Sequence, residues 1–199
     1  MNIVKQKTNS YFILLLISSL YSTIINIPDD YLNIQDGINS SVDGDTILVA
    51  PGTYQENLVI DKSIVLASHA IFDNLDDWVV YDDVFYEQWV VNNYHINNTT
   101  ILGNNPVDLN FGSAILITSE DMCIEPEIIG FTIKNGLGTV VSKDNELKRI
   151  GGAVLADISN PLIHYNSFLE NGGINVESGG AIQLTSSAED WDFNDRFEN

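Results

Sequence analysis

Short apolar runs, rich in β-branched side chains, recur along the chain from Thr46 to Leu184 and are separated by Gly, Asn, Asp, Ser or Pro. The runs are TILVA, NLVI, SIVLAS, TTILG, AILITS, EIIGFTI, GAVLA, PLIHYNSF and GAIQL. Strands that are this short and this numerous are typical of two architectures, a β-sandwich and a solenoid of repeated coils. The pattern therefore predicts an all-β chain and leaves two ways of arranging its strands.

Two internal repeats favour the solenoid. GGAVLADISN (151–160) matches GGAIQLTSSA (179–188) at an offset of 28 residues. PEIIGFTIKNG (126–136) matches PLIHYNSFLENG (161–172) at an offset of 35 to 36, with one inserted residue. Both blocks occur in the same order: a proline-led strand, Asn-Gly and a Gly-Gly-Ala strand. We expect such a chain to wind, each coil laying its strands in parallel on the previous coil.

A helical pattern precedes the first of these strands. Ile34, Ile38 and Val42 follow one another at intervals of four residues, which places them on one face of a helix. Asn33 stands where an N-cap residue would satisfy the first free backbone N–H groups. The sequence therefore predicts one short amphipathic helix at about 33–42, before the strands begin.

The N-terminus indicates export. Lys5 and Lys7 precede the apolar run YFILLLISSL (11–20), the pattern of a secretory signal peptide. A membrane span needs about 20 apolar residues, so this run is short for one; an uncleaved anchor is the alternative. We expect a signal peptide over 1–27 and a mature domain over 28–199, secreted or held at the outer cell surface without a membrane span.

The charge of the chain limits its partners. Eight Lys and Arg stand against 28 Asp and Glu, for a net charge of −20. Such a surface repels phosphate backbones and anionic lipid, so nucleic acid is not an expected partner. The single cysteine, Cys123, excludes an internal disulfide.

A segment rich in aromatic residues interrupts the winding at about 69–98. It is too long for a corner between strands, and long loops in compact folds often carry function. Trp78, Tyr81, Tyr86 and Trp89 alternate here with acidic residues and are the candidate glycan-binding residues, since aromatic rings can stack on sugars. The alternative is that they pack against the flank of the coils. A polysaccharide or a cell-surface glycan is the partner that these residues suggest.

An acidic stretch near the end suggests calcium. In EDWDFND, Asp190, Asp192 and Asn194 stand at alternate positions, as in the first half of a calcium-binding loop. Asp195 occupies the position where such a loop needs glycine, and no bidentate Glu follows. An ordinary acidic loop is the alternative, and calcium is the only cofactor that the sequence suggests.

The opening YLNIQDGINSSVDGDTILVAPGTYQENLVIDKSIVLAS resembles the start of right-handed parallel β-helix proteins of the pectin-lyase-like superfamily. GFTIKNG followed by GGAVLADISNPLIHYNSFLENGG resembles the repeat of exported bacterial β-helix proteins. The resemblance spans roughly Ile27 to Thr185, apart from the aromatic insertion. It implies an all-β, right-handed parallel β-helix (a solenoid) whose open end is capped by a short N-terminal α-helix.

The enzymatic signatures of that superfamily are not intact here. NSFLENGG aligns with the catalytic strand of pectinesterases but has Glu170-Asn171-Gly172 where the catalytic Asp should come. Polygalacturonases need Gly-His-Gly and Arg-x-Lys motifs, neither of which the sequence contains, and pectate lyases need calcium-binding acids beside an Arg or Lys base. We therefore predict no catalytic residue.

The leading interpretation of function is a non-catalytic exported scaffold that presents loops for cell-surface attachment or glycan binding. The alternative is a carbohydrate-active enzyme, a lyase or a hydrolase, whose active site lies outside this sequence or has diverged. The last residues suggest a further loop rather than a closing cap, so we expect an N-terminal fragment of a longer β-helix protein, truncated at its C-terminal end.

Overall fold

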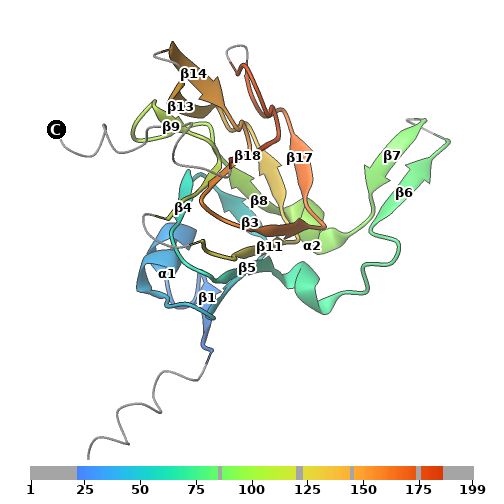
Figure 1. The fold of residues 1–199 in the computed structure, drawn as a ribbon. Helices are drawn as coiled ribbons and strands as arrows, with labels where there is room; N and C mark the ends of the chain where they lie inside the picture. Colours follow the sequence, from blue (N-terminus) through green and yellow to red (C-terminus); the bar gives the residue numbers. More distant parts are fainter. Residues whose placement is uncertain (1–21, 85–86, 120–122, 144–145, 174–175, 186–199) are drawn as a thin grey trace, which may run out of the picture.

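The computed structural model of the protein describes residues 22–84, 87–119, 123–143, 146–173 and 176–185 (Figure 1). The fold is predominantly β-structure, with parallel sheets and a short helix near the start of the described chain. No helix in these ranges is long and apolar enough to cross a membrane.

Three parallel sheets, named here A, B and C, make up the body of the structure. Sheet A contains, in spatial order, β1 (Ile24–Ile27), β2 (Thr46–Val49), β5 (Val65–Ser68), β11 (Glu127–Ile129) and β16 (Leu162–His164). Sheet B contains β3 (Gly52–Tyr54), β8 (Thr99–Leu102), β12 (Thr132–Lys134) and β17 (Ser167–Leu169). Sheet C contains β4 (Leu58–Ile60), β10 (Ile115–Ile117), β15 (Val154–Asp157) and β18 (Ile182–Thr185).

From β2 onward the chain visits these sheets in a fixed order, A then B then C, coil after coil. The strand register confirms the repeat offsets that the sequence predicts. Val154 pairs with Ile182, 28 residues later, and Glu127 pairs with Leu162, 35 residues later. Parallel strands stacked in this cyclic order are compatible with a β-helix-like solenoid.

The core lies between the three sheets. Successive side chains of a strand point to opposite faces, so β4 buries Leu58 and Ile60 and exposes Val59 between them. Phe131, at the turn from sheet A to sheet B, is the largest fully buried side chain. Asn166 occupies the same turn one coil later, and its Oδ1 accepts a hydrogen bond of 2.9 Å from the Phe131 backbone N–H. Stacked turns therefore contribute both apolar packing and hydrogen bonds to the core.

The helix α1 (Ile34–Ser40) lies where the sequence predicts a helix. Its N-cap is Asn33, whose Oδ1 accepts a hydrogen bond of 2.9 Å from the backbone N–H of Asp36. Ile34 and Ile38 are fully buried, and the helix packs against β1, β2 and β4. The amphipathic face that the sequence indicates is thus turned toward the core.

The folded domain begins earlier than the boundary at residue 27 that the sequence predicts. β1 pairs in parallel with β2, and its residues Ile25 and Ile27 are buried in the core. In the sequence, this Ile-rich strand is indistinguishable from a continuation of the apolar leader, which explains the difference. Of the predicted signal peptide, residues 1–21 lie outside the described ranges, and Ile24–Ile27 belong to sheet A.

The aromatic insertion has its own secondary structure. It contains the 3-10 helix η1 (His69–Phe72), the antiparallel strands β6 (Val79–Asp82) and β7 (Gln88–Val91), and the helix α2 (Tyr94–Asn98). Figure 1 shows the β6–β7 hairpin projecting away from the parallel sheets.

The root of this hairpin is fixed to the body. Leu75 packs on an apolar cluster outside sheet A, and the ring of Trp78 meets that of Tyr165 edge-on at 5.8 Å. Asp73 precedes the hairpin and His95 follows it. Oδ2 of Asp73 lies 2.7 Å from Nδ1 of His95. That hydrogen bond, with a second from Asn93, lowers the pKa of Asp73.

A second insertion covers part of sheet C. It forms the antiparallel hairpin of β13 (Gly138–Lys143) and β14 (Glu146–Ile150), which continues through β13 into the short strand β9 (Phe111–Gly112). Val141 and Ile150 of this hairpin are buried against Leu116 and Leu155, which face outward from sheet C. The hairpin leaves the part of the sheet nearest to α1 uncovered.

Candidate functional site

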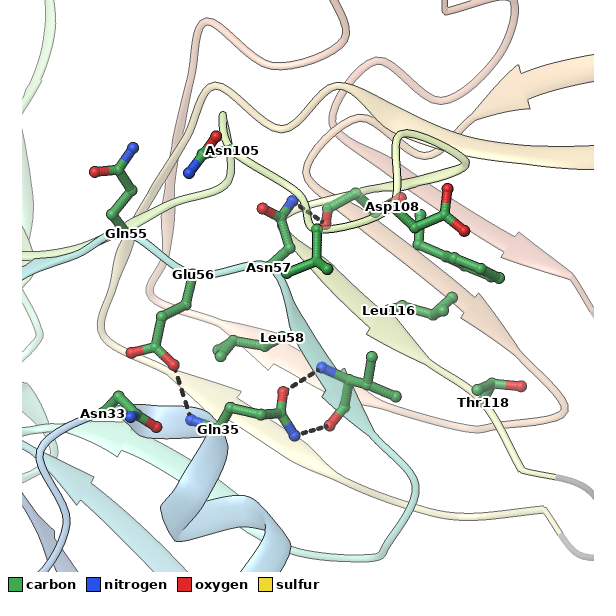
Figure 2. A pocket seen from close by; sticks show the side chains of 14 residues that line it. Asn33, Gln35, Gln55, Glu56, Asn57, Leu58, Asn105, Asp108, Leu116 and Thr118 are labelled. Atoms are coloured by element: carbon green, nitrogen blue, oxygen red, sulfur yellow. Dashed lines mark hydrogen bonds between the residues drawn. The ribbon is translucent and has the colours of Figure 1, made fainter. Parts of the chain in front are cut away.

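A groove with a volume of about 650 Å³ lies outside sheet C, between the start of α1 and the segment that precedes β10 (Figure 2). Its lining side chains come from three stretches of the chain, 33–35, 55–59 and 105–118. These stretches are distant in sequence and are brought together because β4 and β10 are neighbours in sheet C.

The floor of the groove is apolar. Val59 and Leu116 are register partners on β4 and β10, and both line the groove. Leu116 also pairs with Leu155 of β15, which continues the apolar row beneath the β13–β14 hairpin. Phe111 packs against the same cluster and forms part of the groove wall. A ligand lying on this floor would thus meet side chains of Val, Leu and Phe.

One wall is built from the cap helix. Gln35 lies along the free edge of β4: its Oε1 accepts a hydrogen bond of 2.8 Å from the Val59 N–H, and its Nε2 donates one of 3.1 Å to the Val59 carbonyl. Glu56 accepts hydrogen bonds of 2.9 Å from the backbone N–H groups of Ile34 and Gln35, one on each carboxylate oxygen, and Figure 2 shows the one from Gln35. Both oxygens of Glu56 therefore serve to cap α1.

The other wall is attached to β4 through Asn57. Its Nδ2 donates hydrogen bonds of 2.9 Å to the carbonyls of Gly103 and Ser113, which fixes the two ends of the intervening loop. Its Oδ1 is buried and has no hydrogen-bond partner within the described ranges. Buried polar atoms are nearly always paired, so this oxygen is an exception within the described part of the chain.

The rim carries polar groups that are only partly used within the fold. Gln55 donates one hydrogen bond of 3.2 Å, to Asn104, while its Oε1 has no partner among the residues that the structure describes. Asp108 accepts one bond of 2.8 Å from the Asn110 N–H, and the amide of Asn105 has no partner among the described residues. Amide groups both donate and accept, and can therefore pair with hydroxyl groups in either direction.

The described lining of the groove contains few ionisable side chains. Among the described residues it contains no Lys, Arg or His, and its carboxylates are Glu56 and Asp108, of which Glu56 accepts one hydrogen bond from α1 on each oxygen. A pair of available carboxylates is what glycoside hydrolysis requires. Within the described ranges, no group of three His, Cys, Asp or Glu could hold a metal ion. The arrangement suits binding of an uncharged polar ligand with an apolar face.

The predicted aromatic residues lie elsewhere. Trp78 is half-buried at the root of the hairpin, whereas Tyr81 and Trp89 face each other across β6 and β7, with ring centroids 5.6 Å apart. Tyr81 is 52% exposed and Trp89 is 70% exposed. Tyr86 lies outside the described residues. The structure therefore brings two of the four together and separates them from Trp78, and none of the three lines the groove.

The predicted calcium ligands Asp190, Asp192 and Asn194 lie outside the described residues, so calcium binding by this stretch stays a prediction.

Sequence reasoning missed the groove because its walls are assembled from three segments. Tyr54 and Asp45 of the opening segment make contacts within the fold: the Tyr54 hydroxyl donates to the Ala50 carbonyl, and Asp45 accepts from the backbone N–H groups of Thr23 and Val42. The signal that could have revealed the groove is the amide-rich segment GNNPVDLNFGS between two strands, a corner too long for a simple turn.

Asp157 is a buried carboxyl outside the groove, at the end of β15. Burial raises its pKa, although hydrogen bonds from the Thr185 hydroxyl and the Ile158 N–H act in the opposite direction. A raised pKa in the folded state means that the native protein binds the proton more tightly than the unfolded chain. Stability should therefore fall as the pH rises from the unfolded pKa of about 3.9 through the folded pKa, and stay reduced above it.

Asp157→Asn should remove that loss while keeping an acceptor for Thr185. We expect the variant to gain stability over the wild type progressively as pH rises through this window, measured as urea-unfolding free energy at several pH values. Asp61→Asn, on an exposed aspartate next to β4, is the control. If the difference in unfolding free energy between Asp157→Asn and the wild type did not change with pH, a raised pKa of Asp157 would be contradicted.

No protein-family model matches this chain, and no curated protein or solved structure matches it significantly.

Proposed function

We propose that this chain is an exported right-handed parallel β-helix scaffold that binds a neutral glycan in the groove outside sheet C and does not cleave it. The observation that carries the proposal is the composition of the groove: an apolar floor between amide-bearing walls, with no cationic side chain among the described residues that line it and with Glu56 bonded to α1.

The β-helix part of the proposal is supported by the cyclic order of the strands through sheets A, B and C and by register offsets of 28 and 35 residues. The resemblance of the opening segment to pectin-lyase-like proteins supports it as well, as does the placement of α1 against β1, β2 and β4. Export is supported by the resemblance to exported bacterial β-helix repeats and by the basic residues that precede the apolar N-terminal run.

The glycan part is supported by the chemistry of sugars. A pyranose presents C–H groups on its faces and hydroxyl groups around its edge. The C–H face would rest on Val59 and Leu116, and the hydroxyls would pair with the amides of Gln55 and Asn105 and the carboxylate of Asp108. Acidic sugars would gain no counter-charge from the described lining, because it contains no Lys or Arg. The expected ligand is therefore a neutral oligosaccharide.

The test is a panel of neutral and acidic polysaccharides, scored for binding and for release of reducing ends or unsaturated products. We expect binding of at least one neutral glycan with no product. The double variant Gln55→Ala/Asn105→Ala should weaken that binding roughly tenfold, since two hydrogen bonds contribute about 1–3 kcal/mol together.

Asn160→Ala, on an exposed asparagine outside the groove, is the matched control and should bind as the wild type does. Product release would show that the protein is a carbohydrate-active enzyme. Absence of any neutral ligand, or equal binding by the double variant, would overturn the assignment of the groove.

A further inference from the structure

One face of the β6–β7 hairpin carries two exposed aromatic side chains, Tyr81 and Trp89, next to the partly buried Val79 and Val91. The two residues are direct cross-strand partners and share this face with the pair Val79 and Val91. Their rings meet at 67°, edge to face, and both side chains are more than half exposed. Because the hairpin projects from the body (Figure 1), packing on the coils does not account for these aromatic residues.

We propose that this hairpin face, defined by Val79, Tyr81, Trp89 and Val91, docks a cationic, Lys- or Arg-rich segment of a partner protein. The proposal is independent of the groove and of the glycan assigned to it. It rests on the exposed aromatic pair and on the charge of the insertion that surrounds the pair.

The charged side chains of the insertion, apart from its two histidines, are all acidic. The insertion 69–98 contains six Asp and Glu and no Lys or Arg, and no Lys or Arg occurs anywhere between Lys62 and Lys134. Within the insertion, only His69 and His95 could offset these carboxylates, and His95 is bonded to Asp73 at the root. A cationic partner is therefore attracted to the hairpin, and an anionic one is repelled.

The aromatic pair adds a contact that charge alone does not provide. The exposed ring of Trp89 can receive a guanidinium or ammonium group over its face, and tryptophan is the best side chain for such cation–π contacts. Arg is also the basic residue most often found against aromatic rings. In addition, β6 and β7 form a sheet of only two strands, so an extended segment could add a third.

A sugar is a poorer fit to this face. The edge-to-face arrangement of Tyr81 and Trp89 gives a pyranose ring one exposed aromatic face, that of Trp89, instead of two coplanar rings. A neutral sugar could donate hydrogen bonds to the surrounding carboxylates but would gain no ionic attraction from them, and an acidic sugar would be repelled. The original glycan prediction for these two residues is thus the weaker interpretation of the face.

The test measures binding of fluorescent nonapeptides made of arginine, lysine or glutamate, and of a neutral oligosaccharide, to the whole chain. A net charge of −20 attracts any polycation weakly, so the informative comparison is between variants. Trp89→Ala leaves the charge unchanged and should weaken binding of the arginine peptide at least fivefold. Tyr94→Ala removes another exposed aromatic residue, on α2, and should have no such effect.

Charge is tested in the same way. The double variant Asp83→Asn/Glu87→Gln removes two charges from the hairpin turn. It should weaken binding of the arginine peptide and reduce the salt dependence of that binding. The control Asp29→Asn/Glu125→Gln removes two exposed charges elsewhere and should have smaller effects. Circular dichroism verifies that each variant is folded. Equal binding by Trp89→Ala and wild type, or Trp89-dependent binding of the oligosaccharide instead of the peptide, would overturn the proposal.

Discussion

Replacing Gly152 with alanine should destabilise this fold by roughly 2–4 kcal/mol, an effect at the upper end of those seen for overpacking. The position lies just before β15, where successive repeats of the chain approach closely. A Cβ atom there would lie 2.1 Å from the carbonyl oxygen of Gly180 and 2.5 Å from the backbone nitrogen of Gly172. Since both obstacles are backbone atoms, a change of rotamer cannot relieve the clash, and the two coils would have to move apart.

Gly180 provides the matched control for this substitution. It is the equivalent of Gly152 in the repeat 28 residues later, and a Cβ atom on it would meet no atom of the described chain within 4 Å. We expect Gly180→Ala to change the unfolding free energy by less than about 1 kcal/mol in urea titrations. An equal loss of unfolding free energy in Gly152→Ala and Gly180→Ala would contradict the close approach of the backbone at Gly152 to Gly172 and Gly180.

The second large effect is expected at Phe131. Its side chain is fully buried in the centre of the core, so Phe131→Ala removes the apolar contact of the ring and leaves a cavity. Phe→Ala changes in cores typically cost about 3–5 kcal/mol. The loss should appear in urea unfolding as a lower midpoint with an unchanged slope.

Phe72→Ala is the same substitution on the surface, because Phe72 is 71% exposed. It should shift the unfolding free energy by no more than about 0.5 kcal/mol. If Phe131→Ala were as mild as Phe72→Ala, the turn between β11 and β12 would not point into a packed core.

Features of the fold that depend on local sequence could be predicted. Asn33 and the spacing of Ile34 and Ile38 are sufficient to indicate α1, because N-capping and helical periodicity act over a few residues. The repeat offsets anticipate the parallel register, since stacked coils place equivalent residues on top of one another. Ile25 and Ile27 were misassigned because an apolar strand and an apolar leader have the same composition.

The site was harder to predict because it depends on contacts between distant segments. Gln35 reaches β4, and Asn57 reaches Gly103 and Ser113, through hydrogen bonds that span 24 to 56 residues. No local pattern reports such pairs. The aromatic insertion was recognisable from its length and composition, but the separation of Trp78 from the Tyr81–Trp89 pair follows from the hairpin register, which composition does not reveal.

The central claim is that the groove, and not the hairpin, holds the glycan. The direct measurement is a titration of ¹⁵N-labelled protein with the neutral oligosaccharide selected from the panel, followed by NMR. The account predicts shifts in the side-chain amide signals of Gln55, Asn57 and Asn105, while the indole signal of Trp89 stays in place. Shifts confined to Trp89 and the backbone of the β6–β7 hairpin would contradict it.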